Sequence, residues 1–205
     1  MMNNQHPLYL FLFVVLSTFC MVGCSDSANS PSGKASTQAP PTEPDSPPET
    51  VSAPAKSVID AAFVGDVDVI RQHIAAGTDL NLREPIGGGT ALIAAASTGQ
   101  NDSVILLIEG GADLEAKNDD GSTALLTAAF LCHEEVLRTL LKRGADRNAR
   151  NNAGATALDS VASPFGDVKP IYDFLLQVLG PAGLELDYEF IETTRPKIAD
   201  ILRGQ

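Results

Sequence analysis

Three adjacent residues, Cys132, His133 and Glu134, carry the thiol, base and carboxylate that a nucleophilic catalytic site requires. Their adjacency argues against that use, because neighbouring side chains in a helical bend point in different directions. The surrounding sequence also contains no identifiable oxyanion donor. We therefore predict that the chain is not an enzyme and that these residues have structural roles.

Two further patterns resemble ligand sites but lack the necessary donors. Asp79, Asp113 and Asp146 recur about every 33 residues, which supplies each calcium ion with far fewer oxygen ligands than it needs. The glycine run 87–89 lacks the Lys-Ser/Thr continuation and the preceding strand of a phosphate-binding loop. The sequence therefore predicts neither a metal nor a cofactor.

Composition excludes other classes of function. The chain of 205 residues has a net charge of −12 and no basic block long enough to follow a phosphate backbone, so we expect no binding to nucleic acid. Its three cysteines, Cys20, Cys24 and Cys132, have no metal-ligand spacing and form no disulfide framework.

The elements that position these residues come from an internal repeat. Residues 121–125 (Gly-Ser-Thr-Ala-Leu) have counterparts 33 residues before and after, at 88–92 and 154–158. A second pattern, Gly-Ala-Asp at 144–146, recurs at 111–113 and, as Gly-Thr-Asp, at 77–79. Two independent patterns in the same phase indicate a repeat array.

These units resemble ankyrin repeats. They keep the Thr and Leu of the family's turn, the alanine pair of the first helix and the closing Gly-Ala-Asp, although alanine replaces the usual proline at positions 91, 124 and 157. The resemblance implies an all-α ankyrin solenoid of about five helix pairs with short finger loops. It also implies that the recurring aspartates cap turns and that His133 is structural.

We predict an ankyrin domain over residues 56–205. The first repeat lacks its Gly-x-Thr turn, the fourth is stretched by two residues around 163–167, and the last segment resembles a helix pair whose finger loop is deleted. The expected repeats are about 56–84, 85–117, 118–150, 151–180 and 184–205.

The N-terminal quarter has a different character. Leu8 to Val22 is an uncharged apolar run, short for a membrane span, and Gly23-Cys24 completes a lipobox-like motif. We expect residues 1–23 to be a lipoprotein signal peptide and Cys24 to carry the lipid anchor, with palmitate among its fatty acids; an ordinary signal peptide or a short uncleaved anchor is the alternative.

Residues 24–55 are rich in Pro, Ser and Thr and predict a disordered linker. The resemblance to bacterial lipoproteins implies a bacterial envelope location. Because inner-membrane lipoproteins typically carry Asp after the cysteine, Ser25 favours the outer membrane, facing the periplasm, if the host has one.

The resemblance implies that a partner protein binds the finger loops and the concave face of the first helices. The expected contacts are Phe63, Val64, Arg83, Ile86, Lys117, Asp119, Asp120, Phe130, Leu131, Arg150 and Asn152. For Phe63 and Phe130 the alternative is that both rings lie between repeats as core.

The favoured function is therefore a non-catalytic protein–protein interaction module on a monomeric, lipid-anchored protein. Two alternatives stay open. One is an inhibitor or immunity-type lipoprotein that masks a toxin or enzyme, and the other is a structural spacer without a dedicated partner.

Overall fold

The computed structural model describes residues 52–85, 87–179 and 185–204. Within these ranges every regular element is an α-helix. The helices in chain order are α1 (Val58–Val64), α2 (Val67–Ala75), α3 (Ala91–Ser97), α4 (Asn101–Glu109), α5 (Ala124–Phe130), α6 (Glu134–Lys142), α7 (Ala157–Ala162), α8 (Phe165–Leu179) and α9 (Tyr188–Arg203). The predicted signal peptide, lipidation site and most of the linker lie outside the described residues.

The first helix of each of three repeats begins at a threonine. The hydroxyl oxygens of Thr90, Thr123 and Thr156 each accept a hydrogen bond from the backbone N–H three residues later. This bond satisfies one of the free N–H groups at a helix start and stabilises the helix by about 1 kcal/mol. The recurring Thr of the sequence pattern is therefore the residue that fixes where these helices begin.

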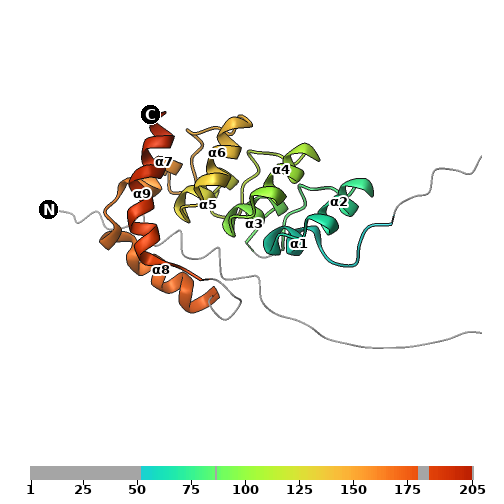
Figure 1. Ribbon diagram of the computed structural model, residues 1–205, viewed down its shortest axis with the longest axis horizontal. Coiled ribbons are helices and arrows are strands. Elements are labelled where there is room, and N and C mark those ends of the chain that lie inside the picture. Colours follow the sequence, from blue (N-terminus) through green and yellow to red (C-terminus); the bar gives the residue numbers. More distant parts are fainter. Residues whose placement is uncertain (1–51, 86, 180–184, 205) are drawn as a thin grey trace, which may run out of the picture.

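The helices form two rows. The first helices α1, α3, α5 and α7 pack side by side, and α2, α4 and α6 form a second row beside them. Figure 1 shows both rows along the stack. Alanines fill the first row, as at Ala61, Ala95 and Ala128, and Leu125 and Leu137 are fully buried between the rows. This architecture confirms the predicted all-α ankyrin solenoid.

A sharp bend joins the two helices of each of the first three repeats. One residue in each bend has a positive φ: Gly65 at 78°, Gly99 at 72° and Cys132 at 61°. Glycine adopts this conformation without steric cost, whereas a residue with a Cβ is strained there. Cys132 therefore occupies the bend position that glycine holds in the two preceding repeats.

The fourth repeat departs from this plan because its bend is Ser163-Pro164. Ser163 is extended, with φ −69° and ψ 148°, as expected for a residue that precedes proline. Without a left-handed residue in this bend, α8 does not turn back beside α6. It lies on the other side of the first-helix row from α2, α4 and α6 (Figure 1).

The last segment is one continuous helix rather than the expected fifth helix pair. α9 packs along α7 and runs across the end of the stack (Figure 1). The Lys197 ammonium lies 2.7 Å from the Glu134 carboxylate of α6, and Arg147 donates to the carbonyl of Leu202 at 3.3 Å. A single helix thus covers the end of the array that a further repeat would otherwise bury.

Among the described residues, no helix is both long and apolar enough to cross a bilayer.

Candidate protein-binding surface

The finger loops, which precede the first helices at residues 83–89, 117–122 and 150–155, are joined to one another at their tips. The Asp119 N–H donates to the Gly87 carbonyl and the Asn152 N–H donates to the Asp120 carbonyl, both at 2.9 Å. The Asn152 side-chain amide also donates to the Asp119 carbonyl at 2.9 Å. The loops therefore form one continuous ledge, held in place before any partner arrives.

Close contact between adjacent fingers requires a glycine at position 121. Gly121 has a φ of 78°, and a Cβ there would lie 2.8 Å from the backbone nitrogen of Asn152. Both the left-handed conformation and this approach exclude a larger residue.

Basic side chains stand in register along the ledge. Arg83 donates to the Gly88 carbonyl and pairs with Asp119 at 2.8 Å, with both side chains about half exposed. The Lys117 ammonium donates to the Arg150 carbonyl at 3.0 Å. These cations therefore tie the loops together while their charges remain accessible to solvent.

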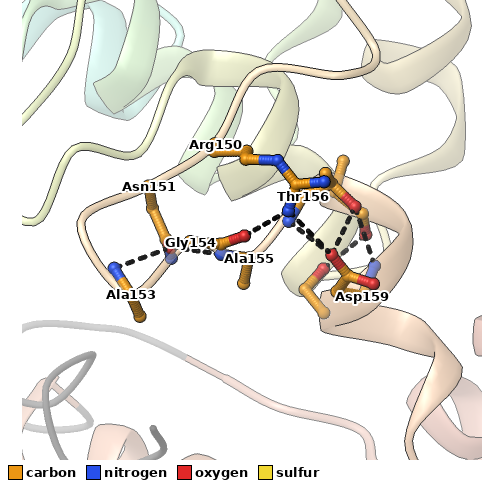
Figure 2. A network of polar contacts seen from close by, with 9 residues as sticks. Arg150, Asn151, Ala153, Gly154, Ala155, Thr156 and Asp159 are labelled. Carbon is orange, nitrogen blue, oxygen red and sulfur yellow. Dashed lines mark hydrogen bonds and ion pairs between the residues drawn. The ribbon is translucent and has the colours of Figure 1, made fainter.

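Arg150 belongs to the polar network at the start of α7 (Figure 2). Its guanidinium donates to the Gly154 carbonyl and lies 4.0 Å from the Asp159 carboxylate. Asp159 accepts from the backbone N–H and the hydroxyl of Thr156, which completes a capping box. These hydrogen bonds hold the pKa of Asp159 below its usual value. The third finger is thereby fixed to the helix that follows it.

The structure corrects the expectation for Asp120, which is buried rather than presented at a tip. Its carboxylate accepts hydrogen bonds from the backbone N–H of Ser122 at 3.2 Å and from the Ser122 hydroxyl at 3.0 Å. Burial raises the pKa of this carboxyl, and the hydrogen bonds partly oppose that rise. Asp120 shapes the turn and is not available for a partner. Ile86, the remaining predicted contact of the first loop, lies outside the described residues.

Phe63 and Val64 are the large apolar side chains that α1 exposes. Phe63 is 39% exposed and Val64 58% exposed. The Phe63 carbonyl accepts a hydrogen bond from the Thr98 hydroxyl at 2.8 Å, which joins the C-terminal ends of the first two repeats' first helices. This position of the array is therefore accessible, as the prediction of a partner contact requires.

Phe130 is not available as the expected partner contact, because α8 covers it, and the alternative that this ring is core holds for Phe130. Phe130 is only 9% exposed, and the Tyr172 ring stacks on its ring with centroids 4.9 Å apart and planes 14° apart. The Tyr172 hydroxyl donates to the Phe130 carbonyl. Leu131, the next residue, is half-buried. The concave face that a partner can reach is thus confined to the earlier repeats.

A buried arginine holds Tyr172 in place. Arg195 of α9 is 2% exposed, and its guanidinium donates to the Tyr172 hydroxyl at 3.1 Å and to the Ser163 carbonyl at 2.9 Å. Burial raises the pKa of Tyr172, so its hydroxyl stays protonated and available as a donor. These bonds connect α5, α8, α9 and the Ser163-Pro164 bend.

The Cys132, His133 and Glu134 side chains do not converge on one site. The thiol is buried near the Ile191 carbonyl, the His133 ring contacts the Ser97 carbonyl, and Glu134 pairs with Lys197 and Arg138. Burial raises the pKa of Cys132 to about 11, so the thiolate that a nucleophile requires is scarce at neutral pH. The arrangement has no nucleophile–base contact.

The fold defines a helical repeat solenoid whose helix pairs are joined by projecting fingers. Residues 58–151 match the family model for ankyrin repeats (3 copies). This part of the chain therefore consists of ankyrin repeats, which indicate a protein–protein interaction module and belong to a family that is generally non-catalytic. No curated protein matches it.

Sequence reasoning missed α8 and Arg195 as determinants of this surface. Ser163-Pro164 was the available signal, because a residue before proline disfavours the helical and left-handed conformations that the regular bend needs. Arg195 carried no comparable signal, since nothing in its sequence position indicates that a charged residue is buried.

Proposed function

We propose that this protein is an envelope-anchored lipoprotein whose ankyrin array binds a partner protein through the finger ledge and the open part of the concave face. The anchor is Cys24, and the location is the outer membrane, facing the periplasm, if the host has one. The protein acts as a monomer and carries out no reaction of its own.

The observation that supports binding most strongly is that exposed polar and apolar groups stand on a rigid framework. Arg83, Lys117 and Asn152 are exposed on loops that are hydrogen-bonded to one another, and Phe63 and Val64 are exposed on an adjacent helix row. A surface that is already ordered loses little conformational entropy on binding. Aromatic and arginine side chains are also the groups that most often dominate binding energy.

Site-specific photo-crosslinking in cells tests the binding surface. A benzophenone side chain at Val64 or Asn152 should yield a crosslinked partner, whereas the same group at Arg71, which is exposed on the second-helix row, should not. Equal crosslinking from all three positions, or none from Val64 and Asn152, would contradict the proposal and favour a structural spacer.

The anchor is tested separately. Replacement of Cys24 by alanine should abolish lipid labelling and leave unprocessed precursor, and the mass of the mature wild-type chain should include lipid. A mature chain without lipid would contradict the envelope-anchored part of the proposal while leaving the binding surface intact.

A further inference from the structure

Phe63 and Phe130 occupy the same place in two repeats. Each directly follows the alanine pair of its first helix, in α1 and α5 respectively. They differ in exposure because α8 covers Phe130, whereas no described helix stacks an aromatic ring on Phe63. The same apolar position is therefore covered at Phe130, which we call the covered copy, and exposed at Phe63, which we call the open copy.

The covered copy shows what this position accepts. α8 buries Val168, Ile171, Tyr172 and Leu175, which are spaced i, i+3, i+4 and i+7 and so form one apolar stripe. From this stripe the Tyr172 ring stacks on Phe130. In the third repeat, therefore, the position after the alanine pair is covered by an amphipathic helix of the same chain, α8, through an aromatic residue of its apolar stripe.

The open copy differs in its charges. Asp60 precedes Phe63 by three residues and Val64 by four, so the three side chains share one face of α1. Glu84 lies close enough that the Asp60 carboxylate, added to the larger effect of burial, raises its pKa. Among the described residues neither carboxylate forms a salt bridge. A complementary helix therefore carries lysine or arginine beside its aromatic residue, which also suits the net charge of −12.

We propose that Asp60, Phe63 and Val64 form a docking surface for a basic amphipathic helix of the partner protein, with an aromatic side chain that stacks on the Phe63 ring. This inference rests on the proposed function and specifies the partner's chemistry. The Phe63 carbonyl accepts the Thr98 hydroxyl and keeps a second lone pair, so a partner tyrosine can both stack on the ring and donate to this carbonyl, as Tyr172 does at Phe130.

Helical peptides copied from α8 provide the probe. The first places Val, Ile, Tyr and Leu at the α8 spacing on an alanine–lysine scaffold. The second has alanine in place of tyrosine, and the third has glutamate in place of every lysine. Fluorescence anisotropy with the full-length protein in detergent measures the Kd of each labelled peptide. We expect the first peptide to bind, and the other two to bind at least about tenfold more weakly.

Three substitutions in the protein locate the site. In Phe63→Ser the new residue is serine because Ser97 occupies the equivalent position in the second repeat. This substitution should weaken binding of the first peptide about tenfold or more. Asp60→Asn should weaken it less and reduce the dependence of Kd on salt. Leu82→Ser is the matched control, because Leu82 is an exposed apolar residue outside this surface, and it should change Kd less than about twofold. Thermal melts of each variant confirm that it is folded, and Val64→Ser replaces Phe63→Ser if that variant does not fold.

Failure of the first peptide to bind, equal binding by Phe63→Ser, or stronger binding of the glutamate peptide would overturn the inference. These results are distinct from failure of the proposed function. A partner crosslinked from Val64 in cells without peptide binding would leave the interaction module standing and reject the helical ligand. Peptide binding at Phe63 without any cellular crosslink would reject the module's role and leave the docking chemistry standing.

Discussion

The imidazole Nε2 of His133 lies 3.1 Å from the carbonyl oxygen of Ser97, so the bend of the third repeat is hydrogen-bonded to the first helix of the second. Because a carbonyl only accepts, Nε2 carries the proton in this bond. Burial lowers the pKa of His133, and the hydrogen bond to Ser97 opposes that change less strongly. The folded protein therefore favours the neutral ring.

The burial of the His133 ring predicts a loss of stability in mild acid. The unfolded chain takes up a proton on His133 near its ordinary pKa of about 6.5, whereas the folded chain takes it up only at lower pH. As pH falls below about 6.5, proton binding therefore favours the unfolded state. Urea melts of His133→Gln, whose amide can still donate to Ser97, should lose less stability than wild type between about pH 7.5 and about pH 5.5. An unchanged pH dependence would contradict the assignment.

Leu125 tests the packing of the array. Its side chain is fully buried in the most regular repeat, so Leu125→Ala should lower the free energy of unfolding by about 2–5 kcal/mol. Leu82→Ala, at a side chain that is 53% exposed, should change it by less than about 0.5 kcal/mol. Denaturant melts measure both. A similar small loss in the two variants would mean that the repeats do not pack as described.

The sequence pattern predicted the repeats well because each one is set by local residues. The threonine at the helix start, the alanine pair and the glycine of the bend act within about ten residues, so their spacing alone places α3 to α7. The tip-to-tip hydrogen bonds of the fingers follow from the same regular stacking.

Features that depend on contacts between distant residues could not be predicted in this way. Register alone places Phe130 on an open face, and only the changed direction of α8 covers it. Asp120 resembled a loop-tip carboxylate, but its hydrogen bonds to Ser122 draw it into the turn. The α9 segment contains apolar residues at repeat spacing, yet it has no bend residue and so continues as one helix.

The Tyr172 hydroxyl predicts a further stability effect. Tyr172→Phe keeps the ring that stacks on Phe130 but removes the donor to the Phe130 carbonyl and the acceptor for Arg195. Because Arg195 is buried, the substitution should cost about 1–3 kcal/mol of stability. Tyr188→Phe is the control, since that hydroxyl contacts Asp173 at the surface, and its effect should stay within about 0.5 kcal/mol. Equal effects would show that the buried network does not hold α8.

The bend at Cys132 predicts an unusual order of stability among its variants. Cys132 has a φ of 61° where the preceding repeats have Gly65 and Gly99, and its side chain is fully buried. Cys132→Ala removes the sulfur's contacts and keeps the strained conformation. Cys132→Gly removes the Cβ as well as the sulfur, and it relieves the strain that a Cβ causes in the left-handed region, about 1–2 kcal/mol. The glycine variant should therefore be more stable than the alanine variant, by less than about 1 kcal/mol after the lost contacts of the Cβ and the greater freedom of glycine in the unfolded chain are subtracted. Paired denaturant melts measure the difference directly. An alanine variant as stable as the glycine variant would mean that the bend relaxes out of the left-handed region and that Cys132 is not strained in the native protein.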